Sequence, residues 1–282
     1  MYGKILAAVN EHINSEVSAR YAINLSKVTG SRLFLCHITP HEAAEEVRAL
    51  SLDAVDRLLR CARSEGVTAE GVTGSGDVVA GIVRLVQREG IGLVFAATRR
   101  KDVERRFYAG TVARSLSIGL PCSVALVRVV HMGRGQPREI LVPLKERMGR
   151  VTEMSYFVAM MARAFDSRVY LFHAAEKKKA VSGIFPRDAG VRPIEQEVEL
   201  PPMVLNFIEQ LEIYKVKHEQ RLRAGPAGEG LTMEAAARRY GLIIMGASER
   251  SLLSSLIRGN PVEEAMRKTP CNLIVLTARH EH

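Results

Sequence analysis

The sequence predicts an α/β fold of two tandem doubly wound domains, each an open, mostly parallel five-stranded sheet with helices on both faces. Short apolar runs typical of buried strands alternate along the whole chain with runs of helical periodicity. Most of the strand-like runs are continuously apolar, which is typical of parallel strands that helices cover on both sides. In addition, the second half repeats landmarks of the first half in the same order.

The repeat is clearest near the end of each half, where a strand-like run leads into a glycine motif and then a Pro-Cys pair. Three landmarks are separated by the same 149 residues: Ala97 and Gly246, Gly110 and Gly259, Cys122 and Cys271. Chance rarely preserves one spacing through three unlike landmarks. We therefore infer a tandem duplication.

The spacing is smaller upstream, at 135 residues between Lys4 and Glu139 and 136 residues between Arg32 and Arg168. The second copy must therefore have gained about 13 residues after its second strand. Loops absorb insertions at little cost, so the insertion is expected in a loop. The proline-containing stretch 181–202 is the expected place.

The length of 282 residues fits two domains, and the polar Gly/Pro segment 131–137 is typical of a linker. We expect domain 1 at 1–130, the linker at 131–138 and domain 2 at 139–282, with an insertion around 176–202.

The first elements are a strand, a helix and a strand. The apolar run 5–9 is bounded by Asn10 and predicts a buried strand. Apolar residues then recur at helical spacing over 17–28, and Gly30 is expected to end that helix. A second apolar run predicts a strand at 33–38.

The next elements continue the alternation. Residues 43–63 have the pattern of an amphipathic helix that ends at Gly66, and 67–73 alternate as a strand does. Asp77 is a suitable N-cap for a helix at 78–88.

The last strands of the first half are expected at 93–97 and 123–129, with a short helix after Gly110 between them. Ligands of doubly wound sheets bind at the carboxyl ends of the strands. Asn10, the segment after Ala97 and the Gly110 turn all fall at that edge.

The composition excludes several classes of function. The formal net charge of +9 is divided about evenly between the halves, and the chain has no Trp, so no nucleic-acid partner is expected. The cysteines lack C-x-x-C and zinc spacing, which suits a reducing cytoplasm. Neither a signal peptide nor a membrane span is predicted, and a cytoplasmic protein is therefore expected.

These motifs resemble the universal stress protein family in its tandem two-domain form, over essentially the whole chain. The family pattern has a glycine after strand four, a second glycine three residues later and, ten residues further, glycine followed by Ser or Thr. It also has an Asp after strand one, a His at the end of strand two and a Pro-Cys start to strand five. The resemblance implies that ATP, where bound, lies between that Asp and the glycine loop.

The first copy departs from the ATP-binding pattern. Asn10 replaces the Asp, Ala97 the first glycine and Arg100 the second, whereas Gly110 and Thr111 remain. A side chain at the second glycine crowds the phosphate path if φ is positive there. Arg100 can instead pair with a phosphate, and Asn10 can still hydrogen-bond a base or ribose.

The second copy departs further. Lys145 replaces the Asp, Glu249 replaces the second glycine, and Gly246 remains, as does Gly259, which is followed by Asn260. The carboxylate of Glu249 would repel a phosphate. The first copy is therefore the better candidate for a surviving ATP site.

His37 and His173 occupy equivalent positions, but no nucleophile with a supporting acid can be paired with either from the sequence. We expect both to be strand-end packing residues. Cys122 and Cys271, at the Pro-Cys strand starts, are expected to be buried rather than redox-active.

The leading hypothesis is a non-catalytic stress-response regulatory protein with degenerate nucleotide loops, acting through ligand sensing or a regulatory protein partner. The alternative is an ATP-binding switch, including a slowly hydrolysing one, that uses the site in domain 1. No Walker-type loop and no adenylyl-transfer loop occurs. The resemblance also implies that the two copies pair through their fifth strands, and a homodimer is expected.

Overall fold

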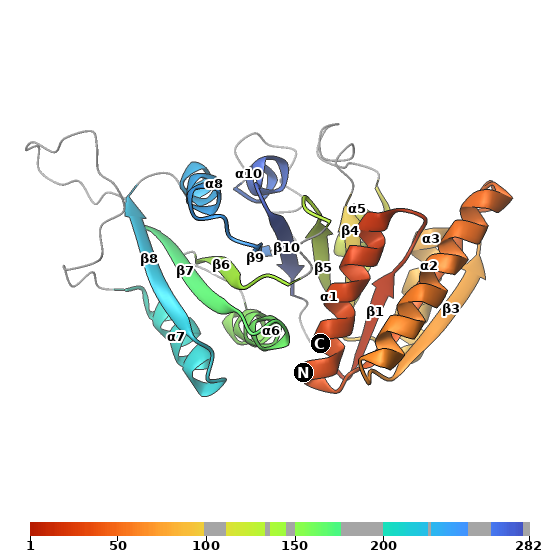
Figure 1. The fold of residues 1–282 in the computed structure, drawn as a ribbon, viewed down its shortest axis with the longest axis horizontal. Coiled ribbons are helices and arrows are strands. Elements are labelled where there is room, and N and C mark those ends of the chain that lie inside the picture. Colours follow the sequence, from red (N-terminus) through yellow and green to blue (C-terminus); the bar gives the residue numbers. More distant parts are fainter. Residues whose placement is uncertain are drawn as a thin grey trace, which may run out of the picture.

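The computed structural model describes residues 1–98, 111–132, 136–144, 150–175, 200–224, 227–247 and 261–278. Its strands form one ten-stranded sheet in the order β3-β2-β1-β4-β5-β10-β9-β6-β7-β8 (Figure 1). The two predicted five-stranded sheets are therefore the halves of one continuous sheet.

The first half contains every strand and helix that the sequence pattern predicts. Its elements are β1 (Lys4–Ala8), α1 (Ile13–Thr29), β2 (Arg32–Thr39), α2 (Glu45–Ser64), β3 (Ala69–Ser75), α3 (Val78–Glu89), β4 (Leu93–Thr98), α5 (Val112–Gly119) and β5 (Ser123–Arg128). Asp77 is the N-cap of α3, since its side chain accepts a hydrogen bond from the Ala80 N–H at 2.7 Å.

The second half repeats this order. Its elements are β6 (Glu139–Leu144), α6 (Val151–Ala164), β7 (Arg168–Ala175), α7 (Pro202–Ile213), β8 (His218–Ala224), α8 (Ala227–Arg238), β9 (Leu242–Ala247), α10 (Pro261–Lys268) and β10 (Asn272–Thr277). Pro202, the last residue of the expected insertion, is the first residue of α7. Residues 176–199 of that insertion lie outside the described residues.

Helices cover both faces of the sheet, and each face has its own apolar core. One core contains residues of α1, α2, α6 and α7, and the other contains residues of α3, α5, α8 and α10. Both cores extend through both halves. In the first core the rings of Phe95 and Phe157, one from each half, have centroids 6.1 Å apart. In the middle of the molecule α1 packs beside α6 (Figure 1).

The halves join through β5 and β10, which pair antiparallel, whereas all strands within each half pair parallel. This confirms the predicted pairing of the fifth strands. Leu126 pairs with Val275, its own counterpart in the repeat, so a pseudo-twofold axis passes through this residue pair. Pairing β5 with β10 removes the exposed edge that each half would otherwise present.

Hydrogen bonds brace the two halves at both ends of this strand pair. The Ser123 hydroxyl at the start of β5 donates to the Glu153 carboxylate on α6, which also accepts from the Tyr2 hydroxyl at 2.9 Å. At the start of β10, Asn272 Nδ2 donates to the Tyr21 hydroxyl on α1 at 3.0 Å. Each fifth strand is thus tied to the first helix of the other half.

The helix C-termini show how the copies have diverged. In the first half three of them are followed by left-handed glycines: Gly30, Gly66 and Gly90, with φ of 69°, 73° and 64°. The second half keeps the left-handed backbone with other residues: Asp166, Lys215 and Arg239, with φ of 49°, 55° and 56°. Residues other than glycine are strained in this region, so the second copy is less well capped.

Replacing Arg239 by glycine is therefore expected to raise the free energy of unfolding by about 1 kcal/mol, as measured by urea denaturation. The reverse change, Gly90→Arg, is expected to lower it by a similar amount, because no atom lies within 4 Å of an added Cβ and only the backbone is strained. Equal stability of Gly90→Arg and the wild type would contradict this account.

No helix in the described part of the chain is long and apolar enough to cross a membrane.

Candidate functional site

A cavity of 380 Å³ opens at the carboxyl ends of β1, β2 and β4, where α1 and α5 begin. This is the edge at which doubly wound sheets bind ligands, and the volume lies in the range of small-molecule sites, roughly 300–1,000 Å³. Polar side chains on its wall come from seven residues: Asn10, Glu11, His12, Ser15, His37, Thr39 and Thr111. Its apolar wall includes Val9, Ile38, Val47, Val78, Ile82 and Leu116.

Asn10 follows β1 and is fixed by the turn that starts α1. Its Oδ1 accepts a hydrogen bond from the His12 N–H at 3.0 Å, and its own N–H donates to Ser15 Oγ at 3.0 Å. Because a backbone N–H can only donate, the atom that faces it must be the amide oxygen. Asn10 Nδ2 has no partner among the described residues. Asn10 therefore offers donors to a ligand, where the family's Asp would offer acceptors.

His37 is buried in the cavity wall and both of its ring nitrogens are engaged. Nδ1 lies 2.9 Å from the Val9 carbonyl, which can only accept, so Nδ1 carries the proton. Nε2 then accepts from the Thr39 hydroxyl at 3.1 Å. In the second half His173 Nδ1 faces the Leu144 carbonyl at 3.4 Å. Both histidines lock the end of the second strand to the end of the first, in agreement with the predicted packing role.

Thr111 is the N-cap of α5, and its hydroxyl accepts a hydrogen bond from the Arg114 N–H at 3.4 Å. Thr111 and the first residues of α5 line the cavity, so the positive end of this helix points to it. Ala97, at the end of β4, lines it as well. The structure thus brings together the predicted residues Asn10, Ala97 and Thr111.

The described residues contain one more predicted site residue, Gly246, in the second half. Gly246 has no positive φ, and an added Cβ would meet only Met154 Sδ, at an ordinary 3.7 Å. Neither the backbone nor the space around it requires glycine. The other predicted site residues lie outside the described residues: Arg100, Gly110, Gly259 and Asn260, together with Lys145 and Glu249.

Cys36 is the one cysteine on the cavity wall, and burial raises the pKa of its thiol to about 12. The thiol therefore stays protonated near neutral pH and is a poor nucleophile. The described residues hold no group of three or more His, Cys, Asp or Glu side chains placed to bind a metal ion.

Sequence reasoning missed four polar cavity residues: Glu11, His12, Ser15 and Thr39. Thr39 could have been found from strand periodicity, since residues two apart point to the same side and His37 was already a candidate. Ser15 carried no such signal, because its position depends on the turn that Asn10 makes.

The fold and the cavity define a tandem doubly wound α/β protein with a ligand-sized site in its first half. A model of the universal stress protein family matches residues 1–128 and 138–277. The chain therefore belongs to the universal stress protein family, in its tandem form.

Solved structures share this architecture over nearly the full length. A universal stress protein from Archaeoglobus fulgidus DSM 4304 has a TM-score of 0.68 at 12% identity, covering 99% of this chain and 97% of that one. A putative universal stress protein from Pseudomonas aeruginosa UCBPP-PA14 has a TM-score of 0.63 at 16% identity, covering 98% and 94%. The cytoplasmic domain of a prokaryotic cation chloride cotransporter has a TM-score of 0.56 at 13% identity, covering 99% and 96%.

At these identities the likeness shows the fold alone. The comparison with curated proteins returns no significant match.

Proposed function

We propose that this protein is a non-catalytic regulatory protein of the stress response, and that its first half senses a nucleotide. The observation that carries the proposal is the 380 Å³ cavity at the carboxyl edge of the first half. It combines the features that a nucleotide needs: apolar walls for a base, unpartnered amide donors on Asn10, and a helix N-terminus at Thr111 for phosphate.

The orientation of the nucleotide follows from these features. The phosphates would lie at the start of α5, and the base would lie near Asn10 and the apolar wall formed by Ile38 and Val47. Since Asn10 Oδ1 is held by the His12 N–H, Nδ2 would donate to an acceptor atom of the base or ribose. This replaces the carboxylate contact of ATP-binding family members, so ATP binding would be weaker than theirs.

Two observations support a sensing role rather than catalysis. The imidazole of His37 has both nitrogens in hydrogen bonds, so it cannot act as a base without breaking one of them. The Cys36 thiol has a pKa of about 12 because it is buried. In the second half, Lys145 and Glu249 stand at the family's ligand positions, and we infer that this half no longer binds a nucleotide.

We further propose that the chain is cytoplasmic, that domains 1–130 and 139–282 are joined by the linker 131–138, and that it acts as a homodimer on a regulatory protein partner.

The test is a thermal shift with Mg-ATP, together with mass spectrometry of small molecules released from the denatured protein. At a concentration a hundredfold above Kd, ATP is expected to raise the Tm of the wild type by about 5 °C. Asn10→Ala removes the free amide donors and Val47→Phe fills the cavity, so both should reduce the shift.

Asn24→Ala is the matched control, because this half-buried asparagine on α1 bonds, among the described residues, only to the Arg20 carbonyl of its own helix. An unshifted wild type that also releases no nucleotide would refute nucleotide sensing, as would an equal loss of the shift in Asn10→Ala and Asn24→Ala.

A further inference from the structure

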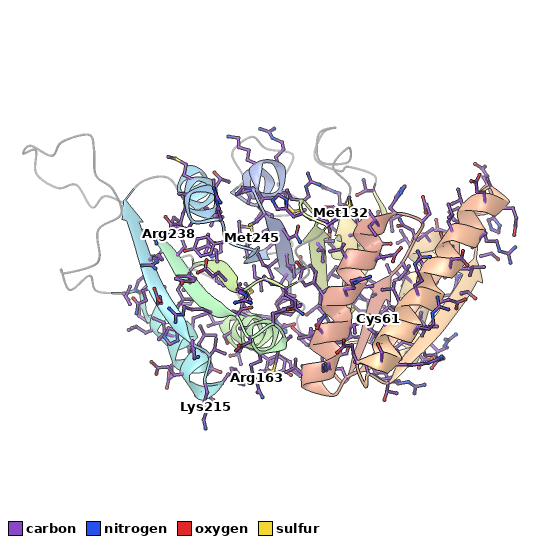
Figure 2. All side chains as sticks on the ribbon, in the orientation of Figure 1. Cys61, Met132, Arg163, Lys215, Arg238 and Met245 are labelled. Carbon is purple, nitrogen blue, oxygen red and sulfur yellow. The ribbon has the colours of Figure 1, made fainter. Side chains whose placement is uncertain are left out.

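A second cavity, of 350 Å³, lies at the amino ends of β6, β7 and β8, where α6 and α7 end. Its wall carries more positive than negative side chains. The cations are Arg138, Arg163, Arg168, Lys215 and Lys217, and the acids are Glu139 and Asp166. Figure 2 labels Arg163 and Lys215 at this edge of the second half.

Only one of these cations is held in an ion pair within the described residues. Arg168 pairs with Glu219 at 2.6 Å, and Glu139 accepts a hydrogen bond from the Tyr170 hydroxyl at 3.2 Å. The other four cations of the wall form no ion pair within the part of the chain that the structure describes. With the carboxylates of Glu139 and Asp166 counted, the wall keeps a formal net charge of +3, carried by solvent-exposed side chains, and this excess favours an anion between them.

The first half provides an internal comparison. The Leu33 N–H donates to the Thr68 carbonyl and the Val169 N–H donates to the Lys217 carbonyl, both at 2.9 Å, so Thr68 and Lys217 are equivalent. By the same register Gly66 corresponds to Lys215, and Gly3 corresponds to Arg138. Three of the five cations therefore stand where the other copy has uncharged residues, and the fold itself does not require them.

Lys215 stands at a position that disfavours it. It has a φ of 55°, whereas its counterpart Gly66 takes the same left-handed conformation without strain. Positive charge is favourable at the end of a helix, and this accounts for Arg163 in the last turn of α6. It does not account for Arg138 and Lys217, which lie beside strands.

We propose that this cavity binds a compact polyanion with two or more phosphoryl groups. The cations come from three separate segments and converge on one small hollow, which suits several negative charges close together. Arginine can hold phosphate oxygens in pairs, while lysine acts as a point charge. The ligand is either a soluble polyphosphorylated molecule or the head group of a phosphorylated lipid, since both present this chemistry.

The first arm of the test uses inorganic tripolyphosphate in isothermal titration calorimetry with the full chain. Wild-type protein is expected to bind it saturably at one site. The double variant Lys215→Gly, Lys217→Thr carries the residues of the first copy, and its affinity should fall at least about tenfold. Because glycine relieves the backbone at position 215, this variant is expected to fold.

The control Arg60→Gln, Arg84→Gln removes two exposed cations of the first half and should change the affinity less than about twofold at the same ionic strength. No binding by the wild type, or equal losses in both double variants, would overturn the site. Asn10→Ala should not affect this binding, so a failure here is distinct from a failure of nucleotide sensing.

The second arm measures co-sedimentation with phosphatidylcholine vesicles, with and without phosphatidylinositol bisphosphate. Sedimentation that requires the phosphorylated lipid, is competed by tripolyphosphate and is lost in Lys215→Gly, Lys217→Thr would identify a lipid head group. Tripolyphosphate binding without vesicle binding would identify a soluble ligand. Vesicle binding that both double variants lose equally contradicts the proposal, because it would reflect overall charge.

Discussion

Replacing Asn272 by alanine is expected to lower the free energy of unfolding by about 3 kcal/mol. Asn272 is 1% exposed, and its Oδ1 accepts hydrogen bonds from the Val130 N–H at 2.8 Å and the His131 N–H at 3.0 Å. Its Nδ2 donates to the Tyr21 hydroxyl of the other half. The truncation leaves these groups without partners, and each buried unsatisfied group costs about 1–3 kcal/mol, partly relieved by water.

Urea denaturation monitored by circular dichroism measures this loss. The matched control is Asn24→Ala, which removes a half-buried asparagine that bonds within α1 and should cost less than about 0.5 kcal/mol. A loss of similar size in both variants would show that Asn272 does not brace the halves.

Asn272 and Ser123 show why the bracing of the halves could not be predicted from the sequence. They are equivalent residues of the repeat, and each bonds to the first helix of the opposite half, yet one is an amide and the other a hydroxyl. Their partners, Tyr21 and Glu153, are 251 and 30 residues away along the chain. Local periodicity carries no information on such contacts, whereas it does predict the strands themselves.

The fold was predictable because buried parallel strands are continuously apolar, and because the same order of landmarks occurs in both halves, so an element recognised in one half supports its counterpart in the other. Where the copies differ, the sequence was less informative. Gly30 clearly ends a helix, but its counterpart Asp166 gives no such signal, although both residues are left-handed.

The candidate site was predictable in part. Asn10, Ala97 and Thr111 follow from the family pattern, and the structure places all three around one cavity. The cationic cavity was not predicted, because neither the even division of charge between the halves nor a local run of cations marks it in the sequence. Lys215 and Lys217 come together with Arg138 only once β6 and β8 lie on either side of β7.

Raising the pH from 10 to 12 is expected to lower the free energy of unfolding by about 2 kcal/mol through Tyr21 alone. Burial raises the pKa of Tyr21 from 10.0 to about 12, although the hydrogen bond from Asn272 opposes it. In the unfolded chain the phenol ionises near pH 10, while in the folded protein it does not until about pH 12. The contribution is therefore complete well below pH 10 and is lost as the pH rises through 10 and then 12, at no more than about 1.4 kcal/mol per pH unit.

Tyr2 acts in the same direction, because burial and then the neighbouring Glu153 carboxylate raise its pKa well above 10.0. The measurement is urea denaturation of wild type and Tyr21→Phe at pH 9.5 and at intervals up to 12. Phenylalanine cannot ionise, so the decline in Tyr21→Phe should be smaller by about 2 kcal/mol, while the titration of Tyr2 and Cys36 is common to both proteins. Parallel declines would contradict the assignment. Since Asn272 stabilises the phenolate by donating to it, Asn272→Ala should raise the folded-state pKa of Tyr21 further. The loss due to Tyr21 would still begin near pH 10 but extend to higher pH, which connects the alkaline transition to the interface between the halves.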